Sequence, residues 1–162
     1  MRVRQPLYPK KIAVTVYGHS VAKARARVVR NKKDDPKAGS HAFTPKKTVE
    51  WEASIYGQSL ASKPPYPWDG PVALGVVFFK RIPRSMSKKK KQQALDGTRR
   101  PAGSRDDYDN MIKAVKDAFN GLYWLDDGQV VEYIPVNGRN PGKYYSDIPR
   151  VEIVVRFLKQ PD

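Results

Sequence analysis

The sequence predicts a single α+β domain in which a mixed β-sheet packs with helices. Its 162 residues, of which 40% are hydrophobic, are enough for one domain with a sizeable core but not for two. Segments that alternate like strands and segments with helical spacing follow in the order strand, helix, strand, helix, helix, strand, strand. The predicted domain covers residues 12–158, and residues 1–11 form a basic, proline-rich N-terminal arm.

The composition favours nucleic acid as the partner and a reducing cytosol as the location. The formal net charge is +15 and no basic amphipathic helix is evident, which disfavours a membrane surface. The absence of Cys excludes disulfides and thiolate zinc sites and fits a reducing compartment. No run of about 18 apolar residues and no signal peptide is present, so we expect no membrane span.

The first half of the chain predicts a strand, a basic loop and a helix. Residues Ile12–Tyr17 alternate apolar and polar side chains, which is typical of a half-buried strand. A loop rich in Lys and Arg runs from Gly18 to Pro45, and a helix follows over residues 47–62. The apolar side chains at helical spacing in that helix are Val49, Ala53, Tyr56 and Leu60.

The middle of the chain predicts a central strand and a short basic helix. Val72–Phe79 is apolar and β-branched throughout, as in a strand buried on both faces. Ser85 or Ser87 then provides the N-cap of a short helix that runs to Leu95. Residues 97–104 form a basic loop.

The last third predicts one helix and two strands. Residues Asn110–Asn120 have the clearest helical pattern, and Gly121 ends that helix. Val130–Val136 and Arg150–Leu158 alternate like antiparallel strands, and a loop rich in Gly, Asn and Pro joins them.

Acidic residues crowd into one short region of this basic chain. Between residues 105 and 132 lie Asp106, Asp107, Asp109, Asp117, Asp126, Asp127 and Glu132. Carboxylates repel a polyanion, whereas a divalent cation held by them binds phosphate. A basic body with an acidic metal pocket indicates a nuclease.

The spacing of these residues places several of them together. In an extended segment Asp107 and Asp109 point the same way and Asp106 points the other way. On the helix that follows, Asp109 and Lys113 lie one turn apart on the polar side. The apolar stripe on the opposite side consists of Met111, Val115, Ala118 and Leu122.

Simpler interpretations of the same residues stay open on spacing alone. Asp109 can serve as a helix N-cap, and Asp126-Asp127-Gly128 can be a turn. Lys113 and Asp117 can form a surface ion pair of a few tenths of a kcal/mol.

Three elements of this region resemble the RusA family of Holliday junction resolvases. Asp107-Tyr-Asp-Asn-Met-Ile-Lys113 resembles the family's D-x-D-N-x-x-K element, and Asp117-Ala118 resembles the D-A that follows it. Trp124-Leu-Asp-Asp-Gly-Gln-Val-Val131 resembles its D-D-x-Q-V element. Weaker similarities extend the resemblance to most of the chain, at Val21–Arg27, Phe43–Pro45 and Phe79–Pro83.

The resemblance implies a set of site residues. Asp107, Asp109 and Asp127 would bind the metal, Mg²⁺ or alternatively Mn²⁺, and act in catalysis together with Lys113, the essential lysine of the family. Asp106 departs from the family pattern, which more often has a basic residue or Pro there, and could compete as a ligand.

The resemblance also implies a function: a Mg²⁺-dependent endodeoxyribonuclease that resolves four-way DNA junctions in recombination and repair. Such an enzyme would be a homodimer whose two active sites nick two strands symmetrically, and it would act in the cytoplasm of a bacterial or phage-infected cell. The alternatives are a non-catalytic nucleic-acid-binding protein and a metal nuclease that prefers flaps or replication forks.

Two basic segments are candidates for DNA contact. One contains Arg25, Arg27 and Arg30 of the early loop, and the other contains Lys80, Arg81, Arg84, Lys88, Lys89, Lys90 and Lys91. Either can track phosphates, or the second can simply be a solvated helix face. Among the aromatic residues, Trp51, Tyr56, Tyr123 and Trp124 are predicted to lie in the core. Tyr144 and Tyr145, in a predicted loop, can stack on bases or be incidental.

Overall fold

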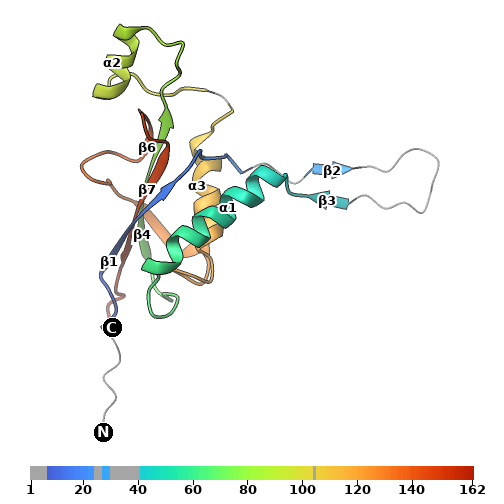
Figure 1. Cartoon of the computed structure of the whole chain (residues 1–162). Coiled ribbons are helices and arrows are strands. Elements are labelled where there is room, and N and C mark those ends of the chain that lie inside the picture. The colour runs from blue at the N-terminus through green and yellow to red at the C-terminus, as the bar shows by residue number, and fades with distance from the viewer. Residues whose placement is uncertain (1–6, 24–26, 30–40, 104) are drawn as a thin grey trace, which may run out of the picture.

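The computed structural model describes residues 7–23, 27–29, 41–103 and 105–162, and it contains an α+β arrangement with a mixed sheet. Side chains are described in all of these ranges except 27–29 and 41–43. In chain order the elements are β1 (Lys11–Tyr17), β2 (Arg27–Val29), β3 (His41–Phe43), α1 (Lys46–Ser59), a 3₁₀ turn (Leu60–Ser62), β4 (Val72–Arg81), α2 (Lys88–Asp96), α3 (Tyr108–Phe119), a second 3₁₀ turn (Asp127–Gln129), β5 (Val130–Tyr133), β6 (Gly142–Ser146) and β7 (Arg150–Phe157) (Figure 1).

Strand β4 is the centre of a five-stranded sheet. Strand β7 lies antiparallel between β1 and β4, and β5 and β6 pair with the other edge of β4, one after the other. The side chains of β4 are buried from Val72 to Phe79. This burial confirms the prediction of a central strand that is covered on both faces.

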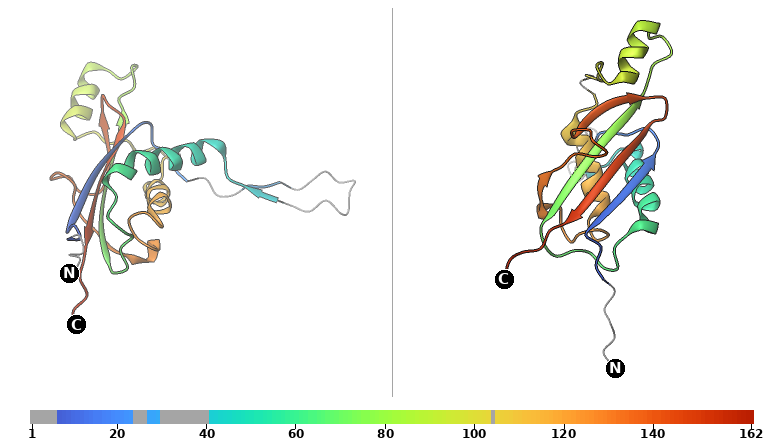
Figure 2. Two further views of the ribbon diagram at one scale, coloured as in Figure 1. Left: turned by 60° about the horizontal axis from the view of Figure 1, so that its bottom comes forward. Right: turned by 90° about the vertical axis from the view of Figure 1, so that its left-hand side faces the viewer.

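Helices α1 and α3 lie together on one face of the sheet (Figure 2). Every second residue of β4, beginning with Val72 and ending with Phe78, enters the main core beneath these helices. On the opposite face Val77 and Phe79 form a smaller cluster with Val136, which lies in the loop after β5. No helix of the described residues is long and apolar enough to cross a membrane.

The C-terminal strands differ from the prediction. Strand β5 does not extend to Val136 and does not pair with β7; it is parallel to β4. The long connection through α2 and α3 brings the chain back in the same direction, as a crossover connection does. Pro135 cannot donate a ladder hydrogen bond and so does not continue the strand. Part of the predicted loop is strand β6, also parallel to β4.

The predicted early loop also contains regular structure. Strands β2 and β3 pair antiparallel within residues 18–45, which the sequence had indicated as loop throughout. Hydrophobic alternation over three residues is too short to predict a strand. The arm predicted over residues 1–11 lies outside the described part up to residue 6, and Tyr8 packs against Tyr66, Trp68 and Phe157.

Helix α1 buries a different face from the predicted one. Val49, Tyr56 and Leu60 are 51%, 46% and 40% exposed, and Ala53 is exposed as well. The buried positions are Thr48, Trp51, Ile55 and Ser59. Trp51 and Ile55 are the large apolar side chains of this face, and they pack in the main core. Tyr56 was therefore wrongly predicted as core, whereas Trp51, Tyr123 and Trp124 are confirmed there.

The short basic helix α2 begins where the sequence predicted. The Ser87 hydroxyl accepts a hydrogen bond from the Lys90 amide at 3.3 Å, so Ser87 rather than Ser85 is the N-cap. Gly97, with φ of 85°, ends the helix in the left-handed conformation. Helix α2 stands at the end of β4, away from the core beneath α1 and α3 (Figure 1).

Gly75 of β4 is required by a close backbone approach. A Cβ atom there would lie 2.6 Å from the Val136 side chain and 2.8 Å from the Ile134 carbonyl oxygen. We expect Gly75→Ala to lower the free energy of unfolding by about 1–3 kcal/mol, because the loop after β5 must shift. Gly57→Ala on α1, where nothing lies within 4 Å of the new Cβ, should instead raise it by about 0.5–1 kcal/mol.

Denaturant unfolding of both variants checks this prediction. Equal stabilisation by the two alanines would show that the loop after β5 does not lie against β4.

Candidate active site

Asp107 caps the N-terminus of α3. Its Oδ1 accepts a hydrogen bond from the Asp109 amide at 2.9 Å, and α3 begins at Tyr108. The N-cap is thus Asp107, not Asp109, which lies in the first turn. Both carboxylates are exposed, and both gain from the partial positive charge at a helix N-terminus.

Helix α3 has one buried face and one polar face, as predicted. The buried residues are Met111, Ile112, Ala114, Val115, Ala118 and Phe119. The Tyr108 hydroxyl donates to the Val76 carbonyl of β4 at 2.7 Å, which fixes the start of the helix on the sheet. The side chain of Lys113 is 49% exposed, on the polar face.

The two acids of the later pair have different roles. The Asp126 carboxylate accepts a hydrogen bond from the Gly128 amide, and the Gln129 side-chain oxygen accepts one from the Asp126 amide at 2.8 Å. The Gln129 amide group also donates to the Trp68 carbonyl oxygen at 2.8 Å. Asp126 is thus the capping residue of a short turn, whereas the Asp127 carboxylate contacts Lys113.

Lys113 of α3 contacts two carboxylates, one on the same helix and one on that turn. Its Nζ lies 2.7 Å from Asp127 Oδ2 and 3.0 Å from Asp117 Oδ1. The second oxygen of Asp117 contacts the amine of Lys23, which also lies 2.9 Å from Glu52 Oε1. Glu52, Lys23, Asp117, Lys113 and Asp127 therefore form a chain of alternating charges, called here the ion-pair chain.

The ion-pair chain shifts the pKa values of its members. The hydrogen bond from Lys113 holds the pKa of Asp127 below its usual range. Hydrogen bonds to Asp127 and Asp117 raise the pKa of Lys113. Partial burial lowers the pKa of Lys23, but the hydrogen bonds to Asp117 and Glu52 outweigh burial and give a net upward shift. All three groups are therefore charged at neutral pH.

Only part of the ion-pair chain is evident from the sequence. Asp117 was recognised as a helical neighbour of Lys113, because the two residues are four apart. Lys23 and Glu52 were missed, because they come from the loop after β1 and from α1. The Lys23 amide donates to the Asn110 carbonyl oxygen at 3.0 Å, and this contact holds the loop against α3.

Asp106 does not join the other acids. Its carboxylate contacts the Lys80 amine, and its carbonyl oxygen accepts a hydrogen bond from Lys143 Nζ at 2.6 Å. Asp106 thus contacts Lys80 and Lys143 rather than the ion-pair chain, and its role as a competing metal ligand stays a prediction.

The three predicted metal ligands are not assembled into a ready-made cluster. Among the described residues, no group of three or more His, Cys, Asp and Glu side chains is placed to hold a metal ion. The donor set nevertheless fits a hard divalent cation, because it consists of carboxylate oxygens alone. Asp127 already binds one cationic group, the Lys113 amine, at 2.7 Å.

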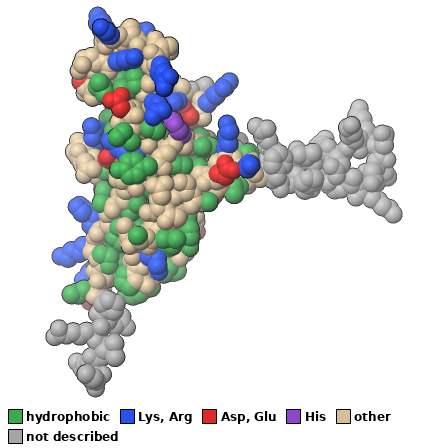
Figure 3. Space-filling model, viewed as in Figure 1, with side chains coloured by type: hydrophobic (Ala, Val, Ile, Leu, Met, Phe, Trp, Pro, Cys, Tyr) green, Lys and Arg blue, Asp and Glu red, His purple; other side chains and the backbone are tan. Residues whose placement is uncertain are grey.

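The predicted DNA contacts are only partly described. Arg25 and Arg30 lie outside the described residues, and the side chain of Arg27 in β2 is not described. Lys and Arg side chains gather over α2 and the neighbouring end of the sheet (Figure 3). Arg81, Arg84, Lys88, Lys89 and Lys90 are exposed there, and Lys91 is partly exposed.

Tyr144 and Tyr145 lie in strand β6 rather than in a loop. The guanidinium of Arg100 covers the Tyr144 ring at 3.5 Å, and the Tyr144 hydroxyl donates to the Asn140 carbonyl oxygen at 2.8 Å. One face of the Tyr144 ring is therefore already occupied by a cation, which leaves it less available for stacking on a base.

Comparison with known proteins identifies the family. Residues 18–156 match the family described as endodeoxyribonuclease RusA. The chain is also 36% identical over 148 residues to a Bacillus subtilis (strain 168) protein named uncharacterized protein YqaN, over 90% of this chain and 95% of that protein. This chain belongs to the RusA endodeoxyribonuclease family. Family membership indicates an endodeoxyribonuclease.

The geometry predicts that Asp117 positions Lys113. We expect Asp117→Asn to reduce single-turnover DNA cleavage about 10-fold or more, because the lysine loses one of its two carboxylates. The melting temperature should change little, because partly exposed ion pairs contribute about 0–1 kcal/mol each. Stopped reactions at saturating protein and thermal unfolding measure the two effects.

Glu50→Gln is the matched control, because it breaks an exposed pair with Lys46 on α1. It should leave both quantities unchanged. If Asp117→Asn lowered the melting temperature but cut DNA at the wild-type rate, Asp117 would be a structural residue only.

Proposed function

We propose that this protein is a divalent-metal-dependent endodeoxyribonuclease that resolves four-way (Holliday) DNA junctions in recombination and repair. The observation that carries the proposal is the contact of Lys113 with Asp127 on the polar face of α3. Family membership supports the proposal, and the two residues lie in separate segments that resemble elements of the family motif. The proposal also includes the family's mode of action, a homodimer that makes paired nicks.

Three carboxylates would hold the metal: Asp107, Asp109 and Asp127. Bound Mg²⁺ or Mn²⁺ would supply a lowered pKa for an attacking water and a positive charge next to the phosphate. These acids lie at the start of α3 and at the turn after it, and both positions are fixed by caps rather than by mobile loops. The metal would thus sit where positive charge from Lys113 is also near.

Lys113 would stabilise the negative charge that develops on the phosphate oxygens. Its second partner, Asp117, keeps the amine near the site when Asp127 serves another cation. Lys23 and Glu52 extend this support to α1, because the Lys23 amine contacts both Asp117 and Glu52. A held amine needs less reorganisation during the reaction than a free surface lysine.

The basic surface would supply affinity for DNA. With a net charge of +15, the protein attracts phosphates without reading bases. Recognition would therefore rest on the shape of the branch and on the spacing of its phosphates. A twofold homodimer suits a junction with approximate twofold symmetry and places two active sites on strands of like polarity.

A panel of labelled substrates tests the proposal. The protein is incubated with a four-way junction, a flap and a linear duplex, each with Mg²⁺ and with EDTA. We expect paired nicks in the junction with Mg²⁺ and none with EDTA. Cleavage of flaps alone would assign another branched substrate, and binding without any cleavage would overturn the proposal in favour of a non-catalytic DNA-binding protein.

The two acids of the later pair should behave differently when changed. Asp107→Asn, Asp109→Asn and Asp127→Asn should each abolish junction cleavage while junction binding stays intact or strengthens, because a carboxylate that repels phosphate is removed. Asp126→Asn should cut at close to the wild-type rate, because Asn is as good an N-cap as Asp. Gel assays of cleavage and binding check both statements.

Similar losses in Asp126→Asn and Asp127→Asn would show that the turn, and not the Asp127 carboxylate, is what cleavage needs. Wild-type rates in any of the other three variants would remove that residue from the site.

The lysines of α2 should provide general affinity. Replacing Lys88–Lys91 with Ala should weaken binding to all DNA shapes alike. The slope of log K against log salt should fall by about 3 to 4, since each phosphate contact contributes about 0.9. The matched control replaces four exposed lysines far from α2, namely Lys10, Lys11, Lys63 and Lys159, and should change the slope less. Equal slopes in both quadruple variants would exclude α2 as a DNA surface.

A further inference from the structure

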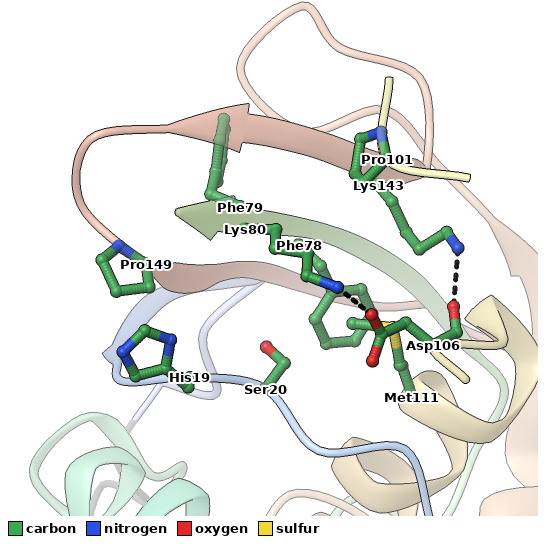
Figure 4. A pocket seen from close by; sticks show the side chains of 10 residues that line it. All are labelled: His19, Ser20, Phe78, Phe79, Lys80, Pro101, Asp106, Met111, Lys143 and Pro149. Carbon is green, nitrogen blue, oxygen red and sulfur yellow. Dashed lines mark hydrogen bonds and ion pairs between the residues drawn. The ribbon is translucent and has the colours of Figure 1, made fainter. Parts of the chain in front are cut away.

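A pocket lies beside the start of α3, between the end of β4 and the loop after β1 (Figure 4). Its volume is about 150 Å³. An apolar cavity of about this size in another protein accepts a benzene ring. Its walls include the aromatic ring of Phe78, the thioether of Met111 and the rings of Pro101 and Pro149. The space and its walls therefore fit a flat ring.

The polar side chains that line the pocket are His19, Ser20, Lys80, Asp106 and Lys143. The Ser20 hydroxyl is buried and has no hydrogen-bond partner among the described residues. Lys80 and Asp106 meet across the pocket, where the lysine amine contacts the carboxylate (Figure 4). A mostly apolar pocket with a few convergent polar groups is typical of a site for a ring with a polar edge.

The pocket adjoins the proposed catalytic carboxylates. Asp106 lines it, and Asp107 is the next residue in the chain. Met111, another wall residue, donates its amide hydrogen to the Asp107 carbonyl oxygen at 2.9 Å. A nucleotide with its phosphate at Asp107 would therefore have this pocket within reach of its base.

The charge in the pocket is compatible with DNA. The contact with Lys80 neutralises the Asp106 carboxylate, so the acid does not repel a phosphate backbone nearby. Lys143, also in the wall, adds a second amine. This pairing gives Asp106 a role that the family motif does not provide.

We propose that this pocket receives an unstacked base next to the phosphate that is cut. The proposal rests on the endonuclease function proposed above. Bases of a continuous duplex are stacked and paired, and removing one costs a few kcal/mol. At a branch point the neighbouring base has already lost part of its stacking, so the pocket can take it at lower cost. Occupancy of the pocket would then favour cleavage of branched over linear DNA.

Single abasic sites in the junction test the proposal. Each nucleotide within two positions of the cut is replaced in turn, and single-turnover cleavage by the wild-type protein is measured with Mg²⁺. At one position the loss of the base should slow cleavage about 10-fold or more, in line with the contribution of one stacked base. Equal rates at every position would overturn the base pocket while leaving the endonuclease function in place.

Filling the pocket provides the second arm. The Ser20→Leu protein should cut the intact junction slowly, at the rate at which the wild-type protein cuts the junction with the sensitive abasic site. For this variant, an abasic site at the same position should not lower the cleavage rate further. Ser62→Leu, at an exposed serine outside the pocket, should keep the wild-type pattern. An abasic effect of unchanged size in Ser20→Leu would place the base elsewhere and contradict the proposal.

Ser20→Ala distinguishes a filled pocket from a general effect of changing Ser20 on folding. It leaves the pocket open and removes only the hydroxyl, so the abasic effect should persist while the intact junction is cut somewhat more slowly. If none of the proteins cut any junction, the proposed endonuclease function itself would be wrong. If the junctions are cut but an abasic site never changes the rate, only the base pocket is wrong.

Discussion

The packing of α3 on strand β4 fixes the position of the candidate active site. Val115 and Phe119 of the helix are fully buried, in the same core cluster as the inward side chains of β4. Each buried side chain of this size contributes about 1.5–3 kcal/mol, whereas a partly exposed ion pair contributes about 0–1 kcal/mol. The apolar face therefore decides how α3 is rotated about its axis. This orientation of the helix places Lys113 on the exposed side, facing Asp127.

Within that frame, charge pairing resolves the conflict between a basic protein and a group of acids. Asp106 is paired with Lys80, Asp117 with Lys23 and Lys113, and Asp127 with Lys113. These three acids therefore lie beside amines, which reduces the repulsion that a bare negative patch would exert on DNA. Asp107 serves a different purpose as the cap of α3, and its carboxylate remains exposed.

The sequence predicted those features that depend on local patterns. Helix α3, the Ser87 cap and the two-sided burial of β4 follow from spacing and residue type over a few turns. The prediction of which face of α1 is buried was wrong because Thr48 and Ser59 are polar, and only tertiary packing shows that they lie inward. The parallel pairing of β5 and β6 depends on the path of the chain through α2 and α3. The contact of Lys23 with Asp117 joins residues that are 94 positions apart, and no periodicity reveals it.

We propose that Asp127 is a metal ligand, whereas its neighbour Asp126 caps the short turn. Calorimetric titration of the DNA-free protein with Mn²⁺ tests it most directly, using wild type, Asp126→Asn and Asp127→Asn. We expect similar affinities for wild type and Asp126→Asn and an affinity at least about 10-fold lower for Asp127→Asn. The same affinity in all three proteins would contradict it.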